Sequence, residues 1–150
     1  IGASIARVRS DLAGASGQRI LVVLTDGEET CDGDAASEIA ALRDLGWDIR
    51  VNIVGFAIDD AELEQTFESW AAAGDGSYFS AVDAGGLADA MTRAVATRFD
   101  VINAEGETVA SGLTGGDPIT LPAGDYRIVS GDREVSSTIL SEEVTTVGLD

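Results

Sequence analysis

A short apolar run that ends in an acidic turn constrains the fold of this chain more than any other feature. The run Ile20–Leu24 reads Ile-Leu-Val-Val-Leu, and Thr25-Asp26-Gly27 follows it directly. An unbroken apolar run of this length predicts a central parallel strand that helices cover on both faces. Asp26 then lies at the carboxyl end of the strand, where open α/β folds place their ligand sites.

Helical and strand-like patterns alternate through residues 1–97. Further strand-like runs occupy residues 49–58 and 77–82, and helical patterns precede, separate and follow the three runs. This alternation predicts a Rossmann-like α/β domain with a mainly parallel, doubly wound sheet. The apolar stripes of the four helices are Ile1, Ile5, Val8 and Leu12; Ile39, Leu42 and Leu45; Leu63, Phe67 and Trp70; and Leu87, Met91 and Val95.

Acidic residues mark where two of these helices begin. Asp34 is placed to cap the second helix, and Gly46 is placed to end it. Asp59, with Glu62 three residues later, forms a capping-box-like start for the third helix.

The pattern changes near Arg98. Beyond it, short alternating runs are separated by turn signals such as Glu105-Gly106 and Gly131-Asp132. Apolar pairs such as Ile119 and Leu121, and the single Val144, bring the expected number of short strands to about six. We therefore expect a small antiparallel all-β module, a sandwich or barrel, over residues 98–150.

The charge and the residue types exclude several classes of function. Asp and Glu number 27 against nine basic residues, all of them Arg, and the formal net charge is −18. Such a field repels phosphate backbones, so we expect no binding to nucleic acid. Histidine is absent and Cys31 is the single cysteine, so a histidine-based triad and an internal disulfide are both excluded.

The length of the apolar stretches and the start of the chain give two further expectations. No stretch approaches the length of about 18 to 20 apolar residues that spans a bilayer. Ile1 enters a helical pattern without an initiator Met, and we interpret the chain as a piece of a longer protein.

Three motifs together resemble a von Willebrand factor type A domain of the bacterial kind. They are Leu-Thr-Asp-Gly-Glu-Glu-Thr-Cys at residues 24–31, Val-Asn-Ile-Val-Gly-Phe at 51–56 and Gly-Asp-Gly-Ser-Tyr-Phe at 74–79. The resemblance covers residues 1–97, about two thirds of the chain. It implies the C-terminal portion of that domain, followed at 98–150 by a module similar to the small β-sandwiches of bacterial surface proteins.

The resemblance also implies a metal site that is incomplete here. The family's metal-ion-dependent adhesion site uses an Asp-x-Ser-x-Ser motif, a Thr, and the Asp of Thr-Asp-Gly; Asp26 matches only the last of these. Ile1-Gly2-Ala3-Ser4 is similar to the segment that follows the family's Thr. We therefore expect Mg²⁺ in the intact parent domain and no tight metal binding by this chain, because one carboxylate displaces too little of the hydration of Mg²⁺.

The missing half has a structural consequence as well. In the family, the strand equivalent to residues 19–25 pairs on one side with a strand that this chain lacks. The resemblance therefore implies an open, apolar sheet edge, and we expect the isolated chain to be unstable or to associate.

The function that the resemblance implies is metal-dependent binding of a protein partner, for adhesion or scaffolding, without catalysis. The partner offers a carboxylate to the metal, and the parent is extracytoplasmic, either secreted or anchored to a membrane. The alternative is a Mg-dependent α/β enzyme or nucleotide-binding domain that uses Asp26. Against it, the chain has no Gly-x-Gly-x-x-Gly, no Gly-Lys-Ser/Thr loop, no Lys and no His.

Two more modest interpretations concern the acidic loop. Asp26 is alternatively a strand-end carboxylate that orders the Gly27 turn through local hydrogen bonds. Glu28, Glu29 and Asp32, with the cap residue Asp34, offer loose Ca²⁺ affinity but fit no calcium-loop spacing. We favour a solvated loop and a helix cap for these four residues.

Overall fold

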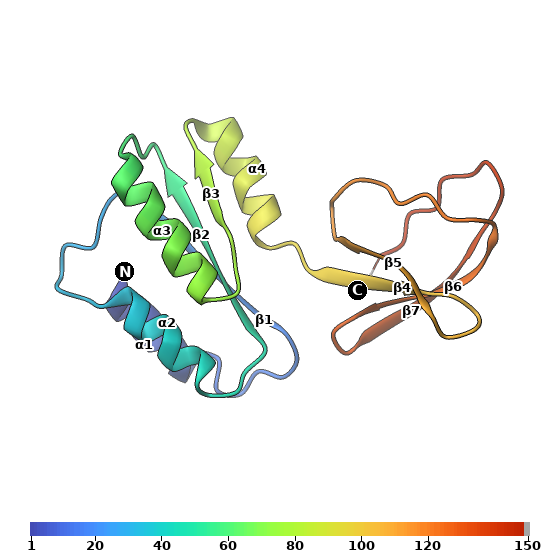
Figure 1. The fold of residues 1–150 in the computed structure, drawn as a ribbon, viewed down its shortest axis with the longest axis horizontal. Helices are drawn as coiled ribbons and strands as arrows, with labels where there is room; N and C mark the ends of the chain where they lie inside the picture. Colours follow the sequence, from blue (N-terminus) through green and yellow to red (C-terminus); the bar gives the residue numbers. More distant parts are fainter. Residues whose placement is uncertain (149–150) are drawn as a thin grey trace. The chain divides into compact units, whose positions relative to one another are not determined.

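The computed structural model describes residues 1–148 and divides the chain into two compact units. The first unit is Ile1–Val95 and the second is Ala96–Asp150. The first unit has mixed α/β content around a parallel sheet, and the second contains a separate antiparallel sheet (Figure 1). The predicted combination of an α/β part followed by an antiparallel all-β part is therefore confirmed at this level.

Helices and strands alternate through the first unit in the predicted order. Gly74 caps the third helix, and the left-handed Gly46, predicted to end the second, follows the Asp44 cap of that helix by two residues. In chain order the elements are α1 Gly2–Asp11, β1 Arg19–Thr25, α2 Ala35–Arg43, β2 Ile49–Phe56, α3 Ala61–Ala73, β3 Tyr78–Ala81 and α4 Ala84–Ala94.

The three strands form a parallel sheet in the order β1-β2-β3. The β1–β2 register runs without a bulge from Arg19 opposite Ile49 to Thr25 opposite Gly55. β3 is shorter and pairs only with the carboxyl half of β2, where Ile53 lies opposite Tyr78. The carboxyl ends of all three strands therefore meet at one edge of the sheet.

The side chains on the two faces of β2 pack against different helices, which explains why most of this strand is buried. Val51 packs into a cluster with Ile5 of α1 and Ile39 of α2, and Ile53 packs against Phe67 of α3. Val54 instead packs against α4. Because both faces of β2 are covered, its residues from Val51 to Gly55 are all buried.

The apolar run alone predicted a central, doubly covered strand for residues 20–24, and that placement is wrong within residues 1–148; the edge position that the resemblance implied for this chain is the one found. Residues 20–24 form β1, but β1 lies at an edge of the three-stranded sheet and its residues are only partly buried. Leu24 is 51% exposed. An apolar run reports a preference for burial, whereas the neighbours of a strand depend on the whole set of elements that fold with it.

Asn52 is the one buried polar residue among those described, and it joins three elements. Its side-chain amide donates a 2.6 Å hydrogen bond to the carbonyl of Ala94 at the end of α4. Its side-chain oxygen accepts a 2.8 Å bond from the N–H of Ser77, just before β3. Both polar ends of the amide are thus satisfied, as burial requires.

One residue of the predicted α4 stripe is on the surface. Leu87 and Met91 pack against the core as expected. Val95 is 54% exposed, because α4 ends at Ala94 and Val95 is its C-cap. No helix among residues 1–148 combines the length and the apolarity needed to cross a membrane.

The second unit is built on one four-stranded antiparallel sheet in the order β5-β4-β6-β7. The prediction of about six strands is wrong within the described residues, because the segments that contain Ile119 and Val144 form none. Both residues are exposed, so their apolar character does not reflect a place in a sheet. The strands are β4 Arg98–Ile102, β5 Thr108–Leu113, β6 Gly124–Ser130 and β7 Arg133–Ile139.

The core of the second unit is small. Val101, Tyr126 and Ile128 are its buried strand residues. Asp125 and Arg127, which flank Tyr126 in sequence, point to the other face of the sheet. There Asp125 accepts a 2.6 Å hydrogen bond from the Thr138 hydroxyl, and the Arg127 guanidinium lies 3.3 Å from the Glu134 carboxylate. One face of the sheet is therefore apolar and the other carries polar cross-strand pairs.

Candidate functional site at the carboxyl edge of the parallel sheet

Asp26 follows β1 directly, at the edge where the three parallel strands end. The hydroxyl of Thr25 donates to the carbonyl of Gly27 at 2.7 Å and accepts from the Gly27 N–H at 3.3 Å. These two bonds close a tight turn around Asp26. Thr25, and not the Asp26 carboxylate, orders this turn, so the interpretation of Asp26 as the residue that orders the turn is wrong.

The Asp26 side chain is exposed at the tip of the turn. Within residues 1–148 it takes part in no hydrogen bond and no ion pair. A carboxylate fixed at a strand end with no internal partner is available to a ligand from outside the chain.

The neighbouring strand ends at the same edge with an unusual backbone. Ala57, the residue after β2, has a φ of 54°, a left-handed conformation that costs about 1–2 kcal/mol for a residue with a Cβ atom. Its N–H donates a 2.7 Å bond to the carbonyl of Ala81 at the end of β3. This bond ties the ends of two strands together beside the Asp26 turn.

Glu29 turns away from Asp26 and toward the start of α1. One carboxylate oxygen accepts from the amino group of Ile1 at 2.6 Å and from the Gly2 N–H at 2.5 Å. The other oxygen accepts from the Cys31 N–H at 2.9 Å. In a chain that begins at Ile1, the Ile1 ammonium, with the N–H groups of Gly2 and Cys31, lowers the pKa of Glu29 from its ordinary value of 4.5 to about 2. Glu29 is thus committed to the protein itself.

Three aspartates near this edge are helix caps. Asp34 accepts from the Ser37 N–H at the start of α2, as predicted. For α3 the predicted cap, Asp59, is wrong: Asp60 accepts from the N–H groups of Glu62 and Leu63, at 2.9 and 3.1 Å.

The third cap, Asp83 of α4, was not predicted from the sequence. Asp83 accepts a 2.8 Å bond from the Gly86 N–H at the start of α4. The signal was an Asp just before a helical stripe, but the Gly85-Gly86 pair that follows it hides the helix start, because glycine disfavours helices.

The acidic side chains near Asp26 do not form a cluster within the described residues. Residues 1–148 contain no group of three or more His, Cys, Asp or Glu side chains placed to hold a metal ion. Asp26 and Glu28 are exposed, while Glu29, Asp34, Asp60 and Asp83 are engaged as described. The two exposed carboxylates belong to no group that could replace most of the water around Mg²⁺, and weak metal binding by this chain stays a prediction.

Cys31 lies in the same acidic loop. Its side chain is exposed and forms no disulfide. Its Sγ atom lies 3.9 Å from the hydroxyl of Thr30, which is a weak contact.

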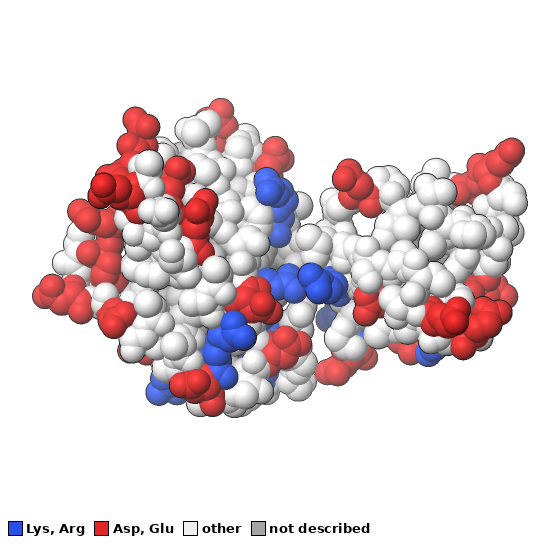
Figure 2. Space-filling model, viewed as in Figure 1, with Lys and Arg blue, Asp and Glu red and all other residues white. Residues whose placement is uncertain are grey.

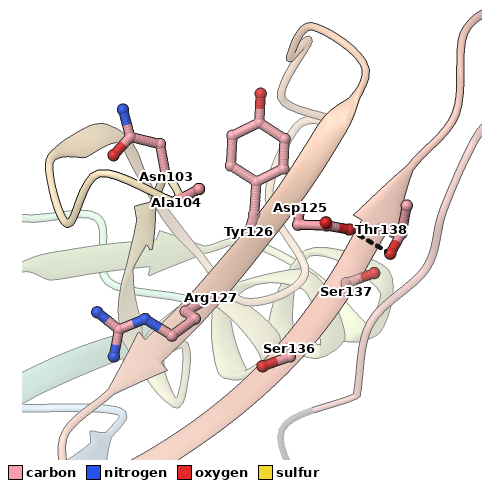
Figure 3. A pocket seen from close by; sticks show the side chains of 8 residues that line it. All are labelled: Asn103, Ala104, Asp125, Tyr126, Arg127, Ser136, Ser137 and Thr138. Carbon is pink, nitrogen blue, oxygen red and sulfur yellow. Dashed lines mark hydrogen bonds between the residues drawn. The ribbon is translucent and has the colours of Figure 1, made fainter.

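A pocket of about 330 Å³ lies in the second unit, between the β4–β5 hairpin and strands β6 and β7 (Figure 3). Its two charged side chains, Asp125 and Arg127, are exposed and already bonded to Thr138 and Glu134. The Tyr126 hydroxyl donates to the carbonyl of Pro122. These groups are satisfied within the unit, so the pocket presents no polar atom that requires a ligand.

Acidic side chains are spread over the visible faces of both units, and basic ones are few (Figure 2). The acidic surface is consistent with the expectation that the chain does not bind nucleic acid, which stays a prediction.

Comparison with known proteins adds one partial similarity. No protein-family model matches the chain. Over 67 residues the chain is 46% identical to "Uncharacterized protein YwmD" of Bacillus subtilis (strain 168), a match that covers 45% of this chain and 30% of that protein. The match thus spans less than a third of the relative, whose name states no activity.

Proposed function

We propose that the chain is part of a metal-ion-dependent protein-binding module of the von Willebrand factor type A kind, with a Rossmann-like doubly wound sheet in its complete form. In this proposal Asp26 supplies one ligand of a Mg²⁺ site, and the other protein ligands come from residues outside this chain. The observation that carries the proposal is the Asp26 carboxylate, exposed at a strand end and without an internal partner.

The coordination chemistry of Mg²⁺ supports the proposed mode of recognition. Mg²⁺ binds six oxygens at about 2.0–2.1 Å and commonly keeps several waters. A carboxylate from a protein partner replaces one of these waters, and the metal then bridges the two proteins. No covalent bond is made or broken, so the proposed role is adhesion or scaffolding and not catalysis.

The proposed setting is a bacterial extracytoplasmic protein that is secreted or anchored to a membrane. This part of the proposal depends on the resemblance of residues 1–97 to the family. The acidic surface is compatible with an extracytoplasmic setting, because a high net charge keeps a protein soluble.

The proposal predicts weak metal binding that is centred on Asp26. We expect Mn²⁺, added in small amounts as a paramagnetic substitute for Mg²⁺, to broaden the amide signals of Asp26 and Gly27 before those of the helix caps. We expect no micromolar Mg²⁺ affinity by isothermal titration, because residues 1–148 hold no group of three or more ligating side chains around one point.

Matched variants decide whether Asp26 is responsible. Asp26→Asn should abolish the early broadening, while Glu28→Gln, which removes an exposed charge two residues away, should preserve it. Broadening spread evenly over the acidic surface, or unchanged in Asp26→Asn, would count against the proposed site.

A further inference from the structure

The loop that connects β1 to α2 (Figure 1) contains the dipeptide Asp32-Gly33. In an Asp-Gly pair the glycine nitrogen can attack the side-chain carboxyl carbon of the aspartate, because glycine has no Cβ atom to obstruct the approach. The product is a five-membered succinimide ring. Water opens this ring either to aspartate or to isoaspartate, in which the main chain runs through the former side chain.

This reaction needs only the protein and water. A bond forms between the glycine nitrogen and Cγ of the aspartate, and the carboxyl OH leaves with the N–H proton as one water molecule. Water then adds to the ring, and isoaspartate results when the bond between the nitrogen and the backbone carbonyl carbon breaks. Because the nitrogen must lose its proton and turn toward the carboxyl group, a hydrogen bond donated by the N–H slows the first step.

The chain contains three Asp-Gly pairs, so the structure can be used to compare them. In all three the aspartate is exposed and the glycine is partly buried, so exposure does not separate them. The three pairs are Asp26-Gly27, Asp32-Gly33 and Asp75-Gly76.

The hydrogen bonding of the glycine N–H does separate the three pairs. The Gly76 N–H donates to the carbonyl of Ala71 at 2.9 Å. The Gly27 N–H donates to the Thr25 hydroxyl at 3.3 Å, which is a longer and weaker bond. Within residues 1–148, the Gly33 N–H donates to no acceptor.

The backbone conformation of the aspartate does not account for this difference. Asp32 and Asp75 are both left-handed, with φ of 54° and 56°. The glycine after Asp75 is nevertheless close-packed, because a Cβ atom added at Gly76 would lie 2.0 Å from the Val51 carbonyl oxygen. Asp75 therefore shares the conformation of Asp32, but its glycine is held by packing and by a hydrogen bond.

We propose that Asp32-Gly33 is the site at which the folded chain forms isoaspartate, and that the unbonded N–H of Gly33 selects it over the other two pairs. The order of rates is then Asp32, Asp26 and Asp75, from fastest to slowest. No metal ion takes part, so this covalent modification is independent of the metal-binding role proposed for Asp26.

The modification would lengthen the main chain by one methylene group at a close-packed point. A Cβ atom added at Gly33 would lie 2.8 Å from a Glu29 carboxylate oxygen and 3.1 Å from the Cα atom of Gly2. The next residue, Asp34, caps α2 through the Ser37 N–H. We expect the longer backbone to displace Asp34 from this position, which removes the N-cap of α2.

Peptide mapping of the full 150-residue chain tests the proposal. The folded chain is incubated at a mildly acidic pH in EDTA and digested, and fragmentation by electron transfer locates isoaspartate, which does not change the mass. We expect isoaspartate to form about fivefold faster at Asp32 than at Asp75, the factor that corresponds to the net free energy of one hydrogen bond. Faster formation at Asp26 or Asp75 would overturn the proposal.

The same incubation in urea is the control for the role of the fold. Unfolding removes the bonds of Gly27 and Gly76, so the three pairs should react at similar rates. A preference for Asp32 that persists in urea would mean that local sequence, and not the unbonded Gly33 N–H, selects the site. Formation of isoaspartate at Asp32 in urea but not in the folded chain would also overturn the proposal.

Two variants test the chemistry and the hydrogen-bond argument separately. Asp32→Glu keeps the charge but would need a six-membered ring, which closes far more slowly, so the product at this position should disappear while the rate at Asp75 stays the same. Thr25→Val removes the hydroxyl that accepts from the Gly27 N–H, so the rate at Asp26 should rise toward that at Asp32. An unchanged rate at Asp26 in Thr25→Val, with circular dichroism showing a folded chain, would contradict the selection by hydrogen bonding.

Discussion

Glu29 shows how a residue in a solvated loop becomes part of the fold. Its sequence position predicts one of four solvated loop acids, yet it accepts a hydrogen bond from the Gly2 N–H at the start of α1, 27 residues away in sequence. An acidic group at a helix N-terminus satisfies N–H donors that have no partner within the helix. A distant contact of this kind leaves no local pattern, so the sequence could not reveal it.

The lowered pKa of Glu29 predicts a pH dependence of stability. In the folded chain that begins at Ile1, the pKa is about 2 against an ordinary value of 4.5, so the contribution of Glu29 is complete above pH 4.5 and is lost as the pH falls toward 2. We expect the free energy of unfolding to fall more steeply in this window for the wild type than for Glu29→Gln, by up to about one proton per molecule. Urea unfolding at a series of pH values measures this slope.

Glu28→Gln is the control for this experiment, because Glu28 is the exposed neighbour of Glu29. It should keep the wild-type slope. If both variants flatten the curve equally, the effect belongs to the general charge of the loop and not to the bonds of Glu29.

At the scale of elements, the start of α3 gives a prediction that separates two adjacent aspartates. Both side chains are exposed, but only Asp60 accepts hydrogen bonds from two N–H groups of the first turn. We expect Asp60→Ala to lower the free energy of unfolding by about 1 kcal/mol, the usual cost of a lost N-cap. Asp59→Ala should change it by less than about 0.5 kcal/mol, as surface substitutions do.

Chemical denaturation of the two variants measures this difference. Equal losses would mean that the assignment of Asp60 as the cap is wrong. The sequence pattern favoured Asp59 because Glu62 follows it at capping-box spacing. The structure instead uses the next aspartate, and helix boundaries are commonly uncertain by one or two residues.

The order and type of the helices and strands were largely predictable from the sequence, but the position of each strand within its sheet was not. The order of helices and strands in the first unit follows from periodicity, and Asp26 follows the end of its strand as expected. The position of β1 at a sheet edge depends on contacts between elements, which a local pattern does not contain. In the second unit, Ile119 and Val144 follow turn signals but lie on the surface, so spacing alone overestimated the number of strands.

At the scale of the whole molecule, the excess of acidic residues makes stability depend on salt. Both units carry more Asp and Glu than Arg, so like charges repel within each compact unit. We expect the midpoint of thermal unfolding to rise by a few degrees between about 0.01 M and about 0.5 M NaCl, because the screening length falls over this range.

Choline chloride serves as the control, because screening depends on ionic strength and not on the identity of the cation. It should raise the midpoint as NaCl does. A rise with Na⁺ alone would mean that the cation binds at a defined place, and the explanation by screening would be wrong.

The Asn52 amide gives the first unit a defined response to mechanical load. Tension applied to the chain beyond Val95 reaches Ala94 first, and the Ala94 carbonyl is fastened to the middle strand through Asn52. Because this buried hydrogen bond anchors the end of α4, we expect unzipping from that end to begin with its rupture.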